Sequence, residues 1–347
     1  MKIRQRYFIK TKDGLFFAVT DNYHPDTHII SFLRYMPCEE GDRVIDGVRY
    51  KKVSSDEAYS FLNKNHPNYL FRWNIENKDS MGVPLEDIVE VLSPVDKLNE
   101  IISSHDNDEF YDKIRLLASI FHEKAGIGYD DMGVSGSTLL NLQNPSTSDI
   151  DFIIFGLDNH RKAINLYSRL KNDADSPLDK ISGKYWKDVY DKRIKDDSMS
   201  FDEFIWYESR KNNRGLIGGT LFDISCSRND SELRDSGAVF SRVVCPMKIH
   251  CKIADDRYSY DAPAVYNVSD VQVLEGPCMN IENIVSFTHT YTGIVKNNEW
   301  VIASGVCEET TDNDSSKMYN LIVGTTRESI NEYVKLDTNP ITGEKEY

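Results

Sequence analysis

The sequence predicts an α+β fold in which a mixed sheet flanked by helices occupies the middle of the chain. Residues 93–236 alternate amphipathic helical patterns with short apolar strands, which is typical of such a core. Residues 1–92 predict a small α+β domain from short β-prone runs and one helix. In residues 237–338, β-prone runs recur about every ten residues, which favours a small barrel or sandwich. We expect a tail over residues 339–347.

Length and composition indicate a folded protein. The 347 residues are enough for two or three domains, and 40% of them are hydrophobic, which supports buried cores. The first residues lack the apolar run of a signal peptide, and no stretch approaches the length of a membrane-spanning segment. The six cysteines show no C-x-x-C spacing, so we expect reduced thiols and not a zinc site. We therefore expect a cytoplasmic protein without a membrane partner.

The net charge of −15 argues against a protein coated for nonspecific nucleic-acid binding, because phosphate neutralisation needs clustered Lys and Arg. The charge is unevenly spread. Residues 161–214 hold 13 Lys and Arg against 10 Asp and Glu. This stretch either solvates helical surfaces or contributes to the binding of an acidic acceptor, and both interpretations stay open.

Residues typical of turns and helix caps predict a hairpin and a helix in the amino-terminal domain. Asp46-Gly47 predicts a hairpin, and Ser54 or Ser55 predicts the start of a helix that runs to about residue 63. The aromatic residues of this domain are expected in its core, in preference to a base-stacking surface.

Helices of the central region have clear starts and stops. Ser93-Pro94 combines an N-cap with proline at the first helical position, and residues 107–124 form an amphipathic pattern that stops at Gly126. After the next strand, Asp158 or Asn159 is expected to cap a helix whose first turn contains three cationic residues, which a nearby anion would stabilise: His160, Arg161 and Lys162. Two more helices are expected over residues 185–194 and 200–212.

Two carboxylates stand one residue apart at the start of an apolar strand. Because side chains alternate along a strand, Asp149 and Asp151 point to one face and Ile150 points to the other. Two adjacent negative charges repel each other unless a cation lies between them. The pattern therefore indicates a metal site, although acids at a solvated strand edge would give the same sequence.

A small turn precedes this strand. Ser135-Gly136-Ser137 can bring backbone N–H groups and a hydroxyl close to an anion, at the start of a short helix expected over residues 138–142. We expect a phosphate group to bind there.

Together, Gly136-Ser137 and Asp149-Ile150-Asp151 resemble the signature of the DNA polymerase β-like nucleotidyltransferase superfamily. That family places a third acidic residue on a neighbouring strand, and Asp223, between Phe222 and Ile224, matches it. The resemblance covers roughly residues 100–230 and implies a nucleotidyltransferase core. The amino-terminal segment is similar to those of uncharacterised archaeal proteins with this core, a similarity that assigns no activity.

The resemblance implies specific roles for these residues. It implies that Asp149, Asp151 and Asp223 are catalytic and hold Mg²⁺ or Mn²⁺, and that Asp223 completes a second metal site or takes a proton from the acceptor. The nucleotide-binding residues that it suggests are Ser135, Gly136, Ser137, Arg161 and Lys184.

The expected activity is transfer of a nucleoside monophosphate from an NTP, with ATP favoured, to a hydroxyl acceptor with release of pyrophosphate. RNA is slightly favoured as the acceptor over a small molecule or a protein. Two alternatives remain: a noncatalytic nucleotide- or RNA-binding module on the same core, and a subunit of a larger assembly with an oligomeric partner.

Overall fold

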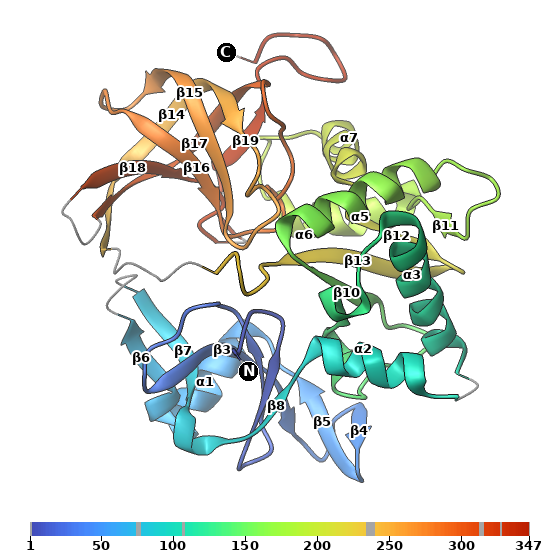
Figure 1. Ribbon diagram of the computed structural model, residues 1–347. Coiled ribbons are helices and arrows are strands. Elements are labelled where there is room, and N and C mark those ends of the chain that lie inside the picture. Colours follow the sequence, from blue (N-terminus) through green and yellow to red (C-terminus); the bar gives the residue numbers. More distant parts are fainter. Residues whose placement is uncertain are drawn as a thin grey trace. The chain divides into compact units, whose positions relative to one another are not determined.

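The chain has an α+β fold with three sheets (Figure 1). The computed structural model describes residues 2–73, 78–105, 108–233, 240–311, 316–326 and 328–346. It divides into two compact units: unit 1 contains Met1–Leu166 and Leu216–Ser236, and unit 2 contains Tyr167–Gly215 and Gly237–Tyr347. The predicted α+β class is thus confirmed, and the boundaries expected near residues 92 and 236 remain predictions.

The amino-terminal sheet of unit 1 has eight strands. Their main order is β4-β5-β3-β2-β1-β8, and β7 pairs with both β3 and β6. Positive φ angles at Asp46 and Gly47, +48° and +79°, form the predicted hairpin between β4 and β5. The strands are β1 (Phe8–Thr11), β2 (Phe16–Val19), β3 (His28–Pro37), β4 (Arg43–Ile45), β5 (Val48–Lys52), β6 (Leu70–Trp73), β7 (Lys78–Pro84) and β8 (Ile88–Leu92).

Helix α1 (Ser55–Asn65) packs on this sheet. Ser54 is its N-cap and forms a capping box with Glu57, as the sequence predicts. The buried face of α1 joins a cluster that includes Ile9, Phe17 and Leu33. The aromatic side chain of Phe17 is therefore a core residue here. Short 3₁₀ turns follow at η1 (Pro67–Tyr69) and η2 (Leu85–Asp87).

The second sheet has the order β11-β12-β13-β10-β9, and its interior strand β10 is buried on both faces. On one face Ile153 and Phe155 join the core of the amino-terminal sheet, and on the other Phe152 packs against Phe121 of α3 at 5.7 Å between ring centroids. Strand β10 is parallel to β13 and antiparallel to β9. The strands are β9 (Met132–Val134), β10 (Ile150–Phe155), β11 (Leu178–Asp179), β12 (Arg214–Ile217) and β13 (Thr220–Ser227).

Four helices accompany the strands of unit 1: α2 (Pro94–Ser103), α3 (Glu109–Ala125), α4 (Gly136–Leu139) and the first part of α5 (Leu157–Leu170). The 3₁₀ turn η3 (Tyr129–Asp131) precedes β9. Ser93 caps α2 and Asp108 caps α3, and α3 ends at Gly126 with φ +67°. These starts and stops confirm the sequence expectations.

Two helix starts differ from the predictions. Helix α4 begins at Gly136, two residues early, because its φ of +62° turns the chain there. Helix α5 begins at Leu157, so neither Asp158 nor Asn159 is its N-cap. The side chain of Glu232 takes the place of an N-cap, because its carboxylate accepts a hydrogen bond from the backbone N–H of Leu157 at 3.0 Å.

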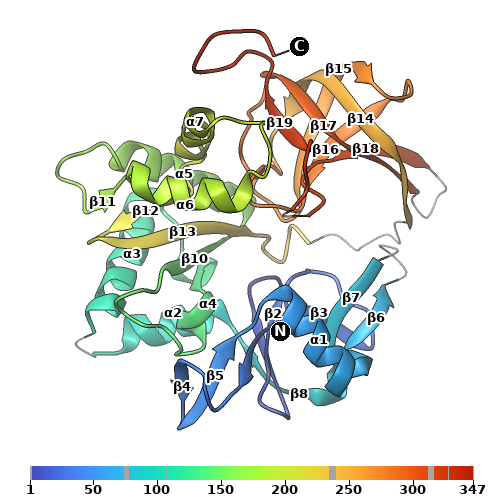
Figure 2. The same cartoon turned by 180° about the vertical axis from the view of Figure 1, so that it is seen from behind.

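The carboxy-terminal strands of unit 2 form a closed barrel, visible from both sides in Figures 1 and 2. Its order is β14-β15-β16-β18-β17, closed by pairing of β14 with β17, and β19 pairs with β17. This decides between the barrel and the sandwich that the sequence left open. The strands are β14 (Phe240–Asp255), β15 (Ala264–Glu275), β16 (Ile281–Ser286), β17 (Trp300–Thr311), β18 (Lys317–Ile322) and β19 (Tyr333–Leu336).

The barrel has β16 parallel to β18, whereas its other pairs among the described strands are antiparallel. This arrangement resembles an OB-fold barrel, whose second and third strands bind oligonucleotides in many proteins. Here the corresponding strands β15 and β16 expose Asp270, Glu275 and Glu282. Exposed acidic residues differ from the basic and aromatic side chains that bind single strands.

Two helices complete unit 2: α6 (Gly183–Arg193) and α7 (Phe201–Lys211), the latter capped by Ser200 as expected. Both contribute to one core with the barrel, in which Trp186 and Phe204 cluster with Ile249 and Val301. The last described residues pair with the strand region before them: Lys335 bonds Glu346 at 2.7 Å, and Thr338 forms a bridge with Lys345.

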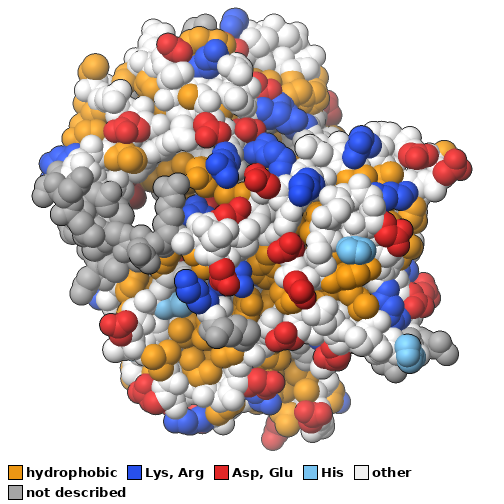
Figure 3. All heavy atoms as spheres, viewed as in Figure 1, with side chains coloured by type: hydrophobic (Ala, Val, Ile, Leu, Met, Phe, Trp, Pro, Cys, Tyr) orange, Lys and Arg blue, Asp and Glu red, His pale blue; other side chains and the backbone are white. Residues whose placement is uncertain are grey.

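Acidic and basic side chains are interspersed over the face seen in Figure 3. Among the residues that the structure describes, no helix is both long enough and apolar enough to span a membrane.

Candidate metal centre

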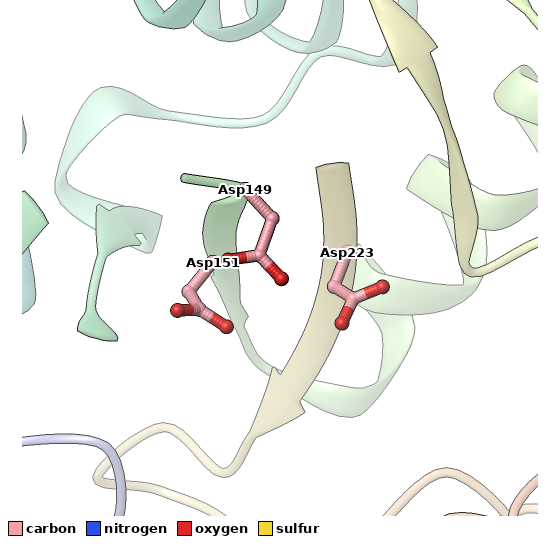
Figure 4. Close-up of side chains that lie close together, drawn as sticks. All are labelled: Asp149, Asp151 and Asp223. Carbon is pink, nitrogen blue, oxygen red and sulfur yellow. The ribbon is translucent and has the colours of Figure 1, made fainter. Parts of the chain in front are cut away.

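Three carboxylates from two neighbouring strands meet at one point of unit 1. Asp149 directly precedes β10, Asp151 is its second residue, and Asp223 lies in β13 (Figure 4). One carboxylate oxygen of each lies within 4.8 Å of those of the other two. Asp151 and Asp223 are register partners in the parallel pair, so the backbone ladder itself places them side by side.

The local sequence explains this arrangement. Ile150 and Phe152 are fully buried, which directs the alternate residue Asp151 to the opposite face of β10. Phe222 and Ile224 do the same for Asp223 in β13. The three-carboxylate cluster expected from the sequence is therefore present.

The cluster is electrostatically costly without a cation. Burial, followed by the negative charges of Asp149 and Asp223, raises the pKa of Asp151 to about 7. Hard carboxylate oxygens at this spacing are the donors that Mg²⁺ and Mn²⁺ prefer. The residues present thus fit the metal that the sequence indicates.

Gly136 is required where the turn passes the carboxylates. A Cβ atom built on it would lie 1.8 Å from Oδ2 of Asp151, and its φ of +62° is strained for other residues. The backbone N–H of Ser135 also donates to the carbonyl oxygen of Asp151 at 2.9 Å. The turn is therefore held against the strand that carries the carboxylates.

The two serines of the turn differ. The buried hydroxyl of Ser135 donates to the carbonyl oxygen of Arg6 at 2.6 Å, so its proton is used within the protein. The hydroxyl of Ser137 is partly buried and lies 3.5 Å from that of Ser148. Of the two side chains, Ser137 is the better placed to contact a ligand.

The prediction of three cationic residues in the first turn of α5 is wrong for His160. His160 is buried, its Nε2–H donates to the carbonyl oxygen of Ile224 at 3.1 Å, and burial lowers its pKa to about 4. It is neutral at pH 7. Arg161 follows it in α5, and Lys184 lies in α6 of unit 2. Nucleotide binding by Arg161 and Lys184 stays a prediction.

Cations from the amino-terminal sheet lie near the carboxylates, and sequence reasoning missed them. The positive charges of Arg6 and Lys52 act on the pKa of Asp151, and those of Arg34 and Arg43 act with the carboxylates on the pKa of Tyr35. Arg43 also donates to the carbonyl oxygen of Leu142 beyond α4. Arg6 lies just before β1 and the other three lie in β3, β4 and β5, so no local motif connects them with Asp149.

The side chains of Arg6, Arg34 and Lys52 form no hydrogen bond or ion pair with other described residues. The charges of Arg6 and Lys52 nevertheless act on Asp151, which holds one of the three carboxylates. This arrangement leaves room for a ligand that carries negative charge of its own.

One relative matches nearly the whole chain. It is the Uncharacterized protein MJ1086 of Methanocaldococcus jannaschii, which is 39% identical over 350 residues, covering 97% of this chain and 99% of the relative. The chain belongs to the family of that protein. No family model and no solved structure matches the chain significantly. The name of the relative assigns it no activity.

Proposed function

We propose that this protein is a metal-dependent nucleotidyltransferase with a core of the DNA polymerase β-like type. The observation that carries the proposal is the meeting of Asp149, Asp151 and Asp223 on two adjacent parallel strands, with carboxylate oxygens within 4.8 Å of one another. A glycine turn held against the same strand supports it. A structural role alone does not account for three clustered carboxylates, since their repulsion destabilises the fold.

In this proposal Asp149, Asp151 and Asp223 hold Mg²⁺ or Mn²⁺. When bound, the ions stabilise the attacking and the leaving oxygen of an in-line displacement. The carboxylates supply the hard ligands, and the strand register fixes them before a substrate arrives.

The triphosphate is held by the turn and by the amino-terminal sheet. The backbone at Gly136 and the hydroxyl of Ser137 face the phosphate groups, and Arg6, Arg34 and Lys52 balance their negative charge. The amino-terminal sheet thereby gains a role in catalysis that its own sequence does not indicate.

The reaction joins the acceptor to the α-phosphate. The acceptor oxygen forms a bond to the α-phosphorus while the bond from that phosphorus to the bridging oxygen breaks, and pyrophosphate leaves. The proton of the acceptor hydroxyl passes to the carboxylate of Asp223. ATP is the favoured nucleotide.

RNA is the acceptor that we favour, on the basis of the excess of Lys and Arg over residues 161–214. Strands β15 and β16 contain no Lys or Arg and expose Asp270, Glu275 and Glu282, so the acceptor would bind elsewhere. A small-molecule or protein acceptor is the competing outcome.

The test is incubation of the full chain with labelled NTPs, Mg²⁺ or Mn²⁺, and a panel of RNA, DNA, small-molecule and protein acceptors. Wild type is expected to label one acceptor class and release pyrophosphate. Asp149→Asn and Asp223→Asn are expected to lower the rate by about 10³-fold, because several kcal/mol of transition-state stabilisation is lost.

Asp130→Asn is the matched control, since Asp130 is an exposed aspartate of the same unit outside the cluster. Activity that survives both Asp149→Asn and Asp223→Asn would refute the proposal. Calorimetry that shows NTP binding without turnover on any acceptor would favour the noncatalytic alternative instead.

A further inference from the structure

Unit 2 contains a cavity that the proposed function does not use. Its volume is about 280 Å³, and it lies between α6, the segment after β16 and the segment after β18. Lys192, Arg193 and Arg214 contribute basic side chains to its wall, and Thr288, Thr326 and Ser329 contribute hydroxyls. Every lining residue belongs to unit 2.

A buried ion cluster lies next to this wall. Glu208, almost fully buried, accepts hydrogen bonds from Lys211 and from Arg193, the latter at 3.2 Å. Lys211 also donates to the carbonyl oxygens of Thr290 at 2.8 Å and His289 at 3.1 Å, and both of these residues line the cavity. One carboxylate therefore faces several cations.

Several positive charges act on one another within the cluster. Burial, together with the positive charges of Arg193 and Arg214, lowers the pKa of Lys211 to about 8, even though Glu208 acts in the opposite direction. The lining holds one further carboxylate, that of Glu332, and it accepts hydrogen bonds from the backbone and hydroxyl of Thr325 at 2.7 and 2.8 Å.

The charges can be counted over the described residues of the lining and the buried cluster. Four cations, Lys192, Arg193, Lys211 and Arg214, stand against Glu208 and Glu332. Over these residues the cations outnumber the carboxylates by two, and a phosphate monoester carries a charge of about −1.5 to −2 at neutral pH. A phosphodiester carries only one negative charge, which matches the excess less well.

The walls are fixed before a ligand binds. Arg214 donates to the hydroxyl of Tyr185 at 3.0 Å, and the backbone N–H of Thr326 donates to Ser329 at 2.9 Å. A Cβ atom on Gly324, where φ is +66°, would lie 2.6 Å from the hydroxyl of Thr288. The segments after β16 and β18 are therefore packed against each other, and the cavity has a defined shape.

We propose that this cavity binds a small phosphate monoester, with its phosphate group between Lys192, Arg193 and Arg214. Arginine forks suit phosphate oxygens because they donate two hydrogen bonds in parallel. The cavity is slightly smaller than the range of about 300–1,000 Å³ that is usual for drug-sized ligands, so a sugar phosphate or a nucleoside monophosphate fits it better than a longer chain.

The test is calorimetric titration of the full chain with ribose 5-phosphate, with ribose, and with a single-stranded oligonucleotide that lacks terminal phosphates. Ribose 5-phosphate is expected to bind and ribose is not. Lys192→Glu, at an exposed position of the lining, is expected to weaken binding at least tenfold because it removes the charge excess.

Lys187→Glu is the matched control. Lys187 lies on the same helix but outside the lining, where it pairs with Asp191 at 2.8 Å. The proposal is overturned if ribose 5-phosphate does not bind, if Lys187→Glu weakens binding as much as Lys192→Glu, or if the oligonucleotide binds more tightly. Asp223→Asn must bind ribose 5-phosphate like wild type, so failure of this proposal is distinct from failure of the proposed function.

Discussion

Each unit buries ionisable side chains, but the balance of charge is opposite in the two. In unit 1 three carboxylates lie together, and their mutual repulsion and burial raise the pKa of Asp151. In unit 2 a single carboxylate, Glu208, has cations on several sides, and their charges hold its pKa below its usual value despite burial. Carboxylates thus predominate in one cluster, and cations predominate in the other.

This difference indicates which ligand each cluster can accept. An excess of carboxylates is relieved by a metal cation, whereas an excess of guanidinium and ammonium groups is relieved by an anion. Since an unbalanced buried charge destabilises a fold, both clusters are candidates for function, in contrast to ordinary exposed ion pairs such as that of Lys187 with Asp191.

The largest change in the free energy of unfolding is expected for a substitution of Glu208. Glu208→Gln removes the one carboxylate that Arg193 and Lys211 share, and uncompensated buried cations should lower the free energy of unfolding by about 3–5 kcal/mol. Urea unfolding measures this change, with the exposed Glu282→Gln as control. Equal stability of the two variants would contradict the view that Glu208 balances the cations.

A third buried group, His160 in unit 1, should make the free energy of unfolding depend on pH. Burial lowers its pKa to about 4 from an unfolded value of 6.5, so its contribution to stability is complete above pH 6.5 and is lost as the pH falls towards 4. Wild type should lose about 3 kcal/mol more than His160→Gln between pH 7 and pH 4. Urea unfolding at both pH values measures the free energy that each protein loses. Equal losses in wild type and His160→Gln would contradict the prediction.

Metal binding should stabilise unit 1. At a Mg²⁺ concentration one hundred times the dissociation constant, the free energy of unfolding should rise by about 2.7 kcal/mol. Asp223→Asn should lose most of this gain, while Asp130→Asn should keep it. Thermal unfolding with and without Mg²⁺ measures the effect. A gain that Asp223→Asn retains in full would place the ion elsewhere.

The smallest expected change in the free energy of unfolding is an increase, whereas Glu208→Gln should cause a decrease. In the presence of a chelator, Asp151→Asn should raise the free energy of unfolding by about 1 kcal/mol, since it removes one of three repelling charges. The same change from carboxylate to amide would then stabilise one cluster and destabilise the other. A lower free energy of unfolding in Asp151→Asn would contradict the view that the charge balance is opposite in the two clusters.

Much of the candidate site of unit 1 could be predicted from the sequence because its signals are local. Asp149 and Asp151 are separated by one residue, and Asp223 has buried neighbours on both sides, so strand alternation alone places them. Helix caps such as Ser54 and Ser93 were predicted for the same reason.

Features that depend on distant residues could not be predicted. The cap of α5 is Glu232, which lies 75 residues from Leu157, and the cations that act on Asp151 come from the segment before β1 and from β5. The cluster around Glu208 combines α6, α7 and β12. Each depends on tertiary packing, which no short motif encodes.

The register that pairs Asp151 with Asp223 has a further consequence for dynamics. Strand β10 pairs with β13 along its whole length and with β9 over residues 152–154, so it is an interior strand of the sheet. Hydrogen exchange at such positions requires opening of the whole unit, whereas the ends of helices exchange through local fraying. Asp151 and Asp223 should therefore keep their backbone spacing through local fluctuations of the protein.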